Sequence, residues 1–129
     1  MKRRLLPLAL ALLLAPLAAW SLTAPLGPAD LLGTWQVDLR PTPDAEPYVQ
    51  AFVVTSVEGD SLQGTFYGSP IERGRVNAAW GAVHFAFVTS DGSGPYHHAG
   101  RLDGDRLEGS TYAVGRGFLL PWRAERASD

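Results

Sequence analysis

The chain contains no cysteine, so neither a disulfide nor a thiolate can contribute to its stability or its chemistry. Lysine occurs once, at position 2, and every basic residue after position 4 is an arginine. No charged residue lies between Arg4 and Asp30, and no stretch after residue 30 has a helical period of apolar residues. These absences leave strand pairing and apolar packing to hold the fold together.

The uncharged stretch near the N-terminus follows the basic residues at positions 2–4 and is almost entirely Leu and Ala over residues 5–19. Basic, apolar and small residues in this order are typical of a secretory signal peptide. We therefore expect residues 1–21 to be a signal peptide, cleaved after Ala19 or Ser21. A membrane anchor, the alternative, needs about 20 apolar residues, and two prolines with a short apolar run disfavour it.

Removal of that segment changes the charge and bounds the remaining domain. The 11 basic residues fall to 8 arginines against 13 acidic residues, a net charge of −5. A nucleic-acid partner would call for a basic face, so none is expected. About 100 residues remain, enough for one domain. We expect a monomer that is secreted or periplasmic and has no membrane contact after cleavage.

Residues 22–32 are predicted to be a linker, and residues 33–126 a single β-domain. Apolar and polar residues alternate there, and turn residues recur about every 8–12 positions. Residues 48–57 are apolar on both faces, so we expect both to be covered. The predicted strands are residues 35–40, 48–57, 62–66, 76–80, 83–87, 96–102, 107–111 and 119–126.

A sequence pattern that occurs twice supports hairpins between neighbouring strands. Residues 57–67 and 102–112 share the form apolar-acid-Gly-Asp-x-Leu-x-Gly-small-x-Tyr. The acid-Gly pair favours a tight turn, because glycine accepts positive φ. The second glycine of each copy, Gly64 or Gly109, would leave room for an aromatic ring from a neighbouring strand. The repeated pattern is explained equally well by duplication of one hairpin and by independent convergence on residues that favour hairpins.

Short strands joined in sequence predict an all-β fold, an eight-stranded antiparallel up-and-down β-barrel. Such a barrel has no exposed sheet edge. Its interior is either filled by side chains or able to hold one small ligand. An open sandwich is the alternative.

Gly33-Thr34-Trp35 stands at the start of the domain, and residues 122–126 form its last predicted strand. Both segments resemble those of calycin barrels, the class that includes lipocalins and avidins. Gly33-Thr34-Trp35 resembles the G-x-W that opens their first strand, and residues 122–126 resemble the last strand of avidins. The resemblance implies a barrel in which Arg123 or Arg126 covers Trp35. It does not imply biotin binding, because Val37 stands where the avidin pattern has asparagine.

No pattern for catalysis or for a metal emerges, so we expect neither an enzyme nor a cofactor. His97 and His98 are adjacent, and adjacent strand residues point to opposite faces, so the pair cannot share one metal in a regular strand. Asp91 and Ser93 lie in a turn without a nucleophile motif. Trp35 and Trp80 are expected near one end of the barrel, where aromatic residues commonly plug the interior.

The connections divide the barrel into two unlike ends. Tight turns at 58–60, 81–82 and 103–104 would share one end, and looser links at 40–47, 68–74, 89–95 and 115–117 the other. Binding usually sits in irregular loops on a rigid scaffold. The residues predicted to bind a ligand at the open end are Tyr48, Arg73, Phe87, Tyr96, His98 and Phe118.

The function expected from this arrangement is an exported binding module for a small apolar or amphipathic molecule. The alternative is a secreted or periplasmic interaction or inhibitor protein that acts on another exported protein through its loops. A further possibility is that side chains fill the interior completely and the loops are only tolerated variation.

The signal peptide makes a testable prediction. Exported protein recovered from its own host should begin between about residues 20 and 30 and stay in the soluble fraction. N-terminal sequencing of both fractions checks this. A chain that still began at Met1 in the membrane fraction would instead support the uncleaved anchor.

Overall fold

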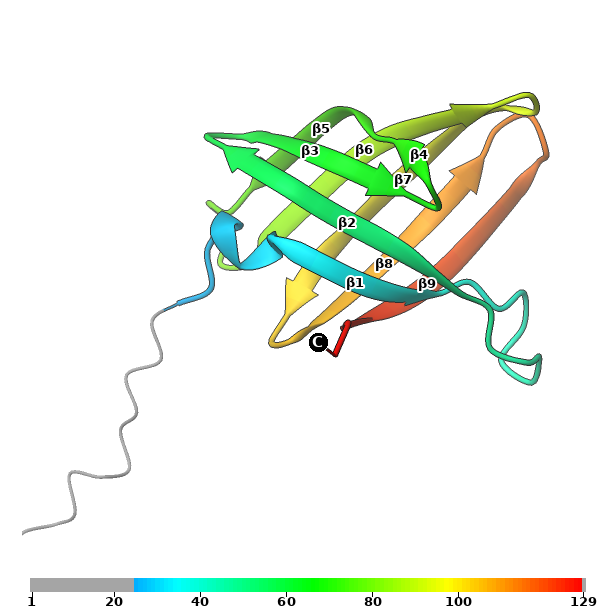
Figure 1. Cartoon of the computed structure of the whole chain (residues 1–129), viewed down its shortest axis with the longest axis horizontal. Helices are drawn as coiled ribbons and strands as arrows, with labels where there is room; N and C mark the ends of the chain where they lie inside the picture. The colour runs from blue at the N-terminus through cyan, green and yellow to red at the C-terminus, as the bar shows by residue number, and fades with distance from the viewer. Residues whose placement is uncertain (1–24, 129) are drawn as a thin grey trace, which may run out of the picture.

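The computed structural model describes residues 25–128, so the predicted signal peptide at 1–21 lies outside the described residues. A short 3-10 helix at Pro28–Leu31 leads into the strands. In residues 25–128 no helix has the length and apolar character that crossing a membrane requires. The strands, labelled in Figure 1, are β1 (Gly33–Asp38), β2 (Val49–Glu58), β3 (Ser61–Phe66), β4 (Ser69–Pro70), β5 (Glu72–Asn77), β6 (Val83–Asp91), β7 (Gly94–Asp103), β8 (Arg106–Ala113) and β9 (Phe118–Arg126).

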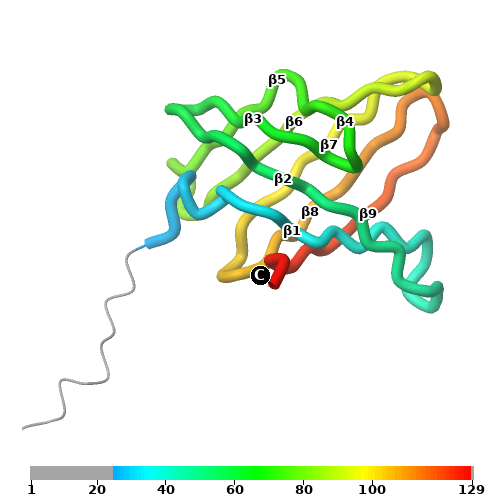
Figure 2. Tube along the Cα trace, in the orientation of Figure 1, coloured from blue at the N-terminus to red at the C-terminus, as the bar shows by residue number. Residues whose placement is uncertain are grey.

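Antiparallel pairing closes these strands into a barrel, as the sequence predicted. Hydrogen-bonded neighbours follow the order β2-β1-β9-β8-β7-β6-β5-β3-β4, and an additional pairing of β2 with β3 completes the circle. The short β4 pairs with β3 in a tight hairpin and leads into β5, so β4 and β5 count as one interrupted strand and eight strands form the wall. When β4 and β5 are counted as one strand, all neighbouring strands except β1 and β9 are consecutive in the chain, which makes the topology up-and-down (Figure 2).

Strand alternation decides which side chains fill the interior. Along β6, Val83, Phe85, Phe87 and Thr89 are buried, and the residues between them are not. The expectation that β2 is covered on both faces is wrong. Its interior face is buried at Phe52 and Val54, but within residues 25–128 no second layer covers its outer face.

The closed end of the barrel is plugged by the start of the domain. Leu31 and Trp35 are fully buried, and the indole Nε1 of Trp35 donates to the Leu31 carbonyl at 2.9 Å. The guanidinium carbon of Arg126 lies 4.2 Å from the Trp35 ring centroid. Arg126 also donates to the carbonyls of Leu32 and Asp30. The arginine over Trp35 is therefore Arg126, and part of the expected linker 22–32 contributes to the core.

Aromatic rings fill the middle of the barrel. Phe52 stacks on Phe87 with ring centroids 4.9 Å apart, and Phe85 and Trp122 stack at 6.4 Å. Gly109 makes room for Trp122, because a Cβ there would lie 2.5 Å from the indole ring. Gly64, its counterpart in the repeated pattern, instead meets the Val53 backbone at a bulge in β2, with φ of 158°.

Several expectations about the connections are wrong. Trp80 does not plug the barrel: β5 ends at Asn77, and the Trp80 side chain is 82% exposed in the following turn. The predicted loop 89–95 is mostly strand, because β6 and β7 pair as far as Asp91 and Gly94, where φ of 108° allows the turn. Residues 39–48 are the longest link at the open end.

The two tryptophans offer a matched stability test. Trp35→Ala should lower the free energy of unfolding by about 3–5 kcal/mol, because it removes a fully buried ring and the contact with Arg126. Trp80→Ala should change it by less than about 0.5 kcal/mol, because that ring is exposed. Urea unfolding measures both. Equal effects would contradict the plug at the closed end.

Candidate functional site

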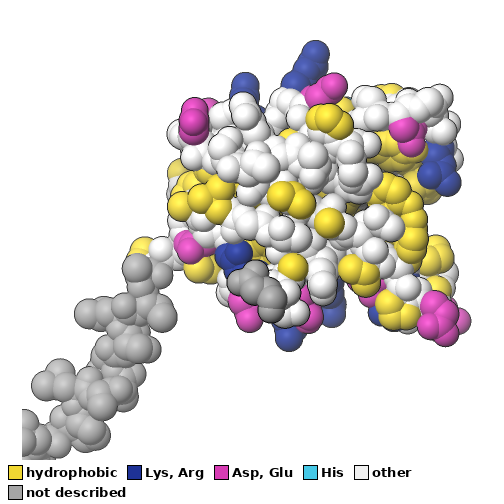
Figure 3. Space-filling view, viewed as in Figure 1, with side chains coloured by type: hydrophobic (Ala, Val, Ile, Leu, Met, Phe, Trp, Pro, Cys, Tyr) yellow, Lys and Arg dark blue, Asp and Glu magenta, His cyan; other side chains and the backbone are white. Residues whose placement is uncertain are grey.

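A cavity of about 590 Å³ occupies the open end of the barrel, above the packed aromatic middle. The β6–β7 and β8–β9 turns meet beside it, where Val114 N donates to the Pro95 carbonyl at 3.4 Å (Figure 1). Hydrophobic side chains also show toward this right-hand end in the space-filling view (Figure 3). The lining comprises Leu39, Pro41, Tyr48, Phe66, Tyr67, Ser69, Thr89, Ser90, Asp91, Tyr96, His98, Thr111, Arg116, Phe118, Leu119 and Leu120.

The floor of the cavity is a chain of buried hydrogen bonds. His98 Nε2 lies 2.8 Å from Thr89 Oγ1, and His98 Nδ1 lies 2.7 Å from Thr111 Oγ1. Trp122 Nε1 donates to Thr111 Oγ1 at 3.0 Å. Consecutive strands β6 to β9 supply one group each, and none of the four side chains is more than 5% exposed. This polar layer separates the cavity from the aromatic core.

His98 is neutral in this setting. The pKa of its imidazole is lowered from 6.5 to about 4, mainly by burial and to a smaller extent by the neighbouring His97. Its partners are two hydroxyls, with no carboxylate among them. The ring also contacts Phe66 and Phe87, with centroids 4.3 and 4.7 Å away. The geometry therefore holds a neutral ring between apolar faces and does not prepare a charged general acid.

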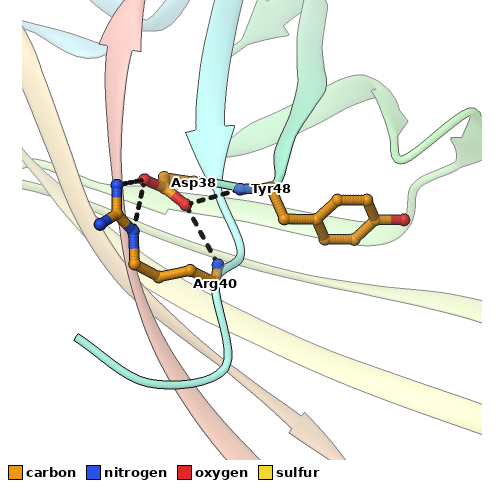
Figure 4. A network of polar contacts seen from close by, with 3 residues as sticks. All are labelled: Asp38, Arg40 and Tyr48. Carbon is orange, nitrogen blue, oxygen red and sulfur yellow. Dashed lines mark hydrogen bonds and ion pairs between the residues drawn. The ribbon is translucent and has the colours of Figure 1, made fainter. Parts of the chain in front are cut away.

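One wall of the mouth is positioned by Asp38 at the end of β1. Its carboxylate accepts from Arg40 Nε at 2.9 Å and Nη2 at 2.6 Å, and from the backbone amide of Tyr48 at 3.2 Å (Figure 4). The Arg40 guanidinium is the main reason that the Asp38 pKa falls to about 2. These contacts close the 39–48 loop at its base, and the Tyr48 ring projects away from the carboxylate.

Tyr48 packs against Tyr67, which lies in a turn with a strained backbone. Tyr67 and Gly68 both have positive φ, 55° and 76°, as a type I′ turn requires. A bulky residue with positive φ is uncommon and marks a position worth examining for function. The Tyr67 and Tyr48 rings pack edge to face with centroids 6.0 Å apart, and their hydroxyls meet.

The far side of the mouth carries the only charged groups that line the cavity among residues 25–128, Asp91 and Arg116. Asp91 accepts from the Tyr96 hydroxyl and from the Ser93 amide, at 2.8 and 2.7 Å. Arg116 lies over the Phe118 ring, 4.9 Å from its centroid. Both carboxylate oxygens of Asp91 therefore have partners within the β6–β7 turn.

Four of the predicted site residues line the cavity: Tyr48, Tyr96, His98 and Phe118. Phe87 does not, because it lies one step deeper on β6 than Thr89, covered by the His98 ring. Arg73 does not either. A bulge between Glu72 and Arg75 interrupts the alternation, and Arg73 has φ of 54° and lines a separate surface depression.

Thr89, Thr111 and Tyr67 are among the lining residues that the sequence did not predict. Thr89 and Thr111 share an interior face with Phe87 and Gly109, so alternation alone could have placed them inside. Tyr67 had no such signal, because its position follows from positive φ in a turn.

Residues 25–128 contain no group of three or more His, Asp and Glu side chains placed to hold a metal. No family model, curated protein or solved structure matches the chain.

Burial of His98 predicts acid sensitivity. The unfolded chain binds a proton near pH 6.5 and the folded state only near pH 4, so stability falls as pH falls between them. From pH 7 to pH 5 the wild type should lose about 2 kcal/mol of unfolding free energy. Urea unfolding of wild type, His98→Phe and the exposed control His84→Asn measures this loss.

Only His98→Phe should flatten this pH dependence, because it removes the buried titrating ring. Asp38 titrates near pH 2, below the window. Equal slopes for wild type and His98→Phe would contradict the assignment to His98.

Proposed function

We propose that the protein is an exported binding module that holds one small apolar or amphipathic molecule in the open-end cavity. The observation that carries this is the cavity of about 590 Å³, set in a barrel whose other end is packed. Small-molecule sites commonly measure about 300–1,000 Å³ and combine apolar walls with a few placed polar groups.

The lining suits a largely apolar guest. Leu39, Phe66, Phe118 and Leu120 supply apolar walls, and the polar groups of the floor already bond to one another. Binding without catalysis is proposed because no carboxylate orients His98 and both adjacent hydroxyls contact a neutral ring. No metal or cofactor is invoked. The barrel and the Trp35–Arg126 contact support calycin-like ancestry, also a proposal.

Export is proposed from the N-terminal sequence alone. Basic, apolar and small residues follow one another before Asp30, and the chain has no cysteine to which a lipid anchor could attach. A soluble exported barrel would meet its ligand outside the cytoplasm.

A second candidate is an interaction protein that acts through its open end. Val49, Tyr112, Val114 and Leu119 are all at least 44% exposed and lie in or next to the open-end halves of β2, β8 and β9. Exposed apolar residues gathered in one region favour a protein contact. This candidate needs no ligand inside the barrel.

Native mass spectrometry of protein purified from its own host separates the two candidates. A retained organic molecule that leaves on collisional activation, and that blocks binding of the uncharged dye N-phenyl-1-naphthylamine, would support the binding module. A stoichiometric protein partner, unaffected by delipidation, with no dye binding would support the interaction protein and contradict our proposal.

Tyr67→Asn separates binding from stability. Asn-Gly suits a type I′ turn, so the free energy of unfolding should stay equal or rise by up to about 1 kcal/mol. Loss of the aromatic wall should weaken dye binding about tenfold, or about 1.4 kcal/mol. Fluorescence titration and urea unfolding measure both quantities.

Tyr112→Asn is the matched control, because Tyr112 is 50% exposed, Tyr67 is 48% exposed, and only Tyr67 lines the cavity. Dye affinity should not change in this variant. Equal weakening by both substitutions would place the dye on the outer surface and refute the cavity.

A further inference from the structure

One polar hydrogen in the floor of the cavity has no hydrogen-bond acceptor among the floor groups. The chain Thr89–His98–Thr111–Trp122 has four groups and three hydrogen bonds. Because His98 is neutral, its ring carries one hydrogen, as do the indole and each hydroxyl. Four hydrogens serve three bonds. The side chains of Thr89 and Thr111 make no other hydrogen bond within residues 25–128.

The tautomer of His98 decides which hydroxyl holds the spare hydrogen. Trp122 can only donate, so Thr111 Oγ1 must accept from it. If His98 carries its hydrogen on Nδ1, Thr111 accepts twice and its own hydrogen is spare. If the hydrogen is on Nε2, Thr111 donates to Nδ1, Thr89 accepts from Nε2, and the Thr89 hydrogen is spare. Both threonines line the cavity.

We propose that the ligand carries an uncharged oxygen acceptor, such as a ketone, aldehyde, ester or amide carbonyl, at its inner end, where it accepts this spare hydroxyl hydrogen. This rests on the proposed function and names the ligand class. A buried donor without an acceptor is unfavourable, so a guest that supplies an acceptor gains over one that does not. The body of the ligand lies against Phe66, Phe118 and Leu120.

The acceptor is uncharged because nothing at the floor offsets a negative charge. The floor groups are neutral, and burying a carboxylate without a cation is strongly unfavourable. Arg116 is the only cation that lines the cavity in the described part of the chain, and it lies at the mouth on Phe118. A charged ligand group would therefore face outward, and the acceptor inward.

Three naphthalenes of similar size test the proposal by isothermal titration calorimetry at pH 7. They are 2-acetylnaphthalene, which has a carbonyl, 2-isopropylnaphthalene, which has none, and 2-naphthoate, which is charged. The ketone should bind about tenfold more tightly than the hydrocarbon, and the carboxylate more weakly than the ketone. Bound ketone should also show a carbonyl stretch lowered by hydrogen bonding.

Two isosteric variants locate the donor. Nitrogen-15 chemical shifts of His98 identify the tautomer. Because the ring hydrogen can move to the other nitrogen when one threonine is replaced, the double variant Thr89→Val/Thr111→Val is the decisive one, and it should reduce ketone affinity about tenfold, to that of the hydrocarbon. The added methyl replaces the hydroxyl and covers the ring nitrogen behind it. Hydrocarbon affinity should not change, which shows that the cavity is intact. Thr55→Val, on the exposed face of β2, is the control.

The outcomes separate the two proposals. Equal affinity for ketone and hydrocarbon, tighter binding of the carboxylate, or a ketone preference that survives the double valine variant would overturn the inference and leave the binding module standing. If no naphthalene binds, the proposed function fails, and the inference fails with it.

Discussion

The contact of Arg126 with Trp35 is the constraint on which the rest of the structure depends. Trp35 and Arg126 are paired residues of β1 and β9, so the contact joins the first and last strands and completes the barrel. It also holds the 3-10 helix, because Arg126 donates to the Asp30 and Leu32 carbonyls. With one end plugged in this way, the interior cavity lies at the other end.

Strand alternation turns that asymmetry into layers. Each inward step along β6, from Thr89 to Phe87 to Phe85, passes from polar cavity floor to aromatic core. An eight-stranded barrel is just wide enough for such rings to fill it. The polar layer is tolerated because its groups bond across four strands, which offsets the loss of solvent. Buried atoms in the cavity floor are therefore stabilised by hydrogen bonds, and those in the core beneath it by aromatic packing.

Features that depend on alternation were predictable from the sequence, and features that depend on backbone irregularity were not. The strands, the barrel, the Trp35–arginine contact and the cavity positions of Tyr96 and His98 follow from period two and from the calycin resemblance. Arg73 does not line the cavity, because a bulge in β5 interrupts the alternation of side chains. Trp80 does not plug the barrel, because β5 ends at Asn77 and no periodic pattern in the sequence marks where a strand ends.

The mouth of the cavity is built for rigidity at the expense of local backbone energy. Tyr67 keeps a positive φ that Asn or Gly would hold with less strain, and the position gives an aromatic wall against Tyr48. Asp38 ties the loop that carries Tyr48 at its base. A mouth fixed before a guest arrives loses little conformational entropy on binding. In the proposed binding module, selectivity would then come from the fit between fixed apolar walls and a neutral floor, which disfavours a charge at the inner end of the guest.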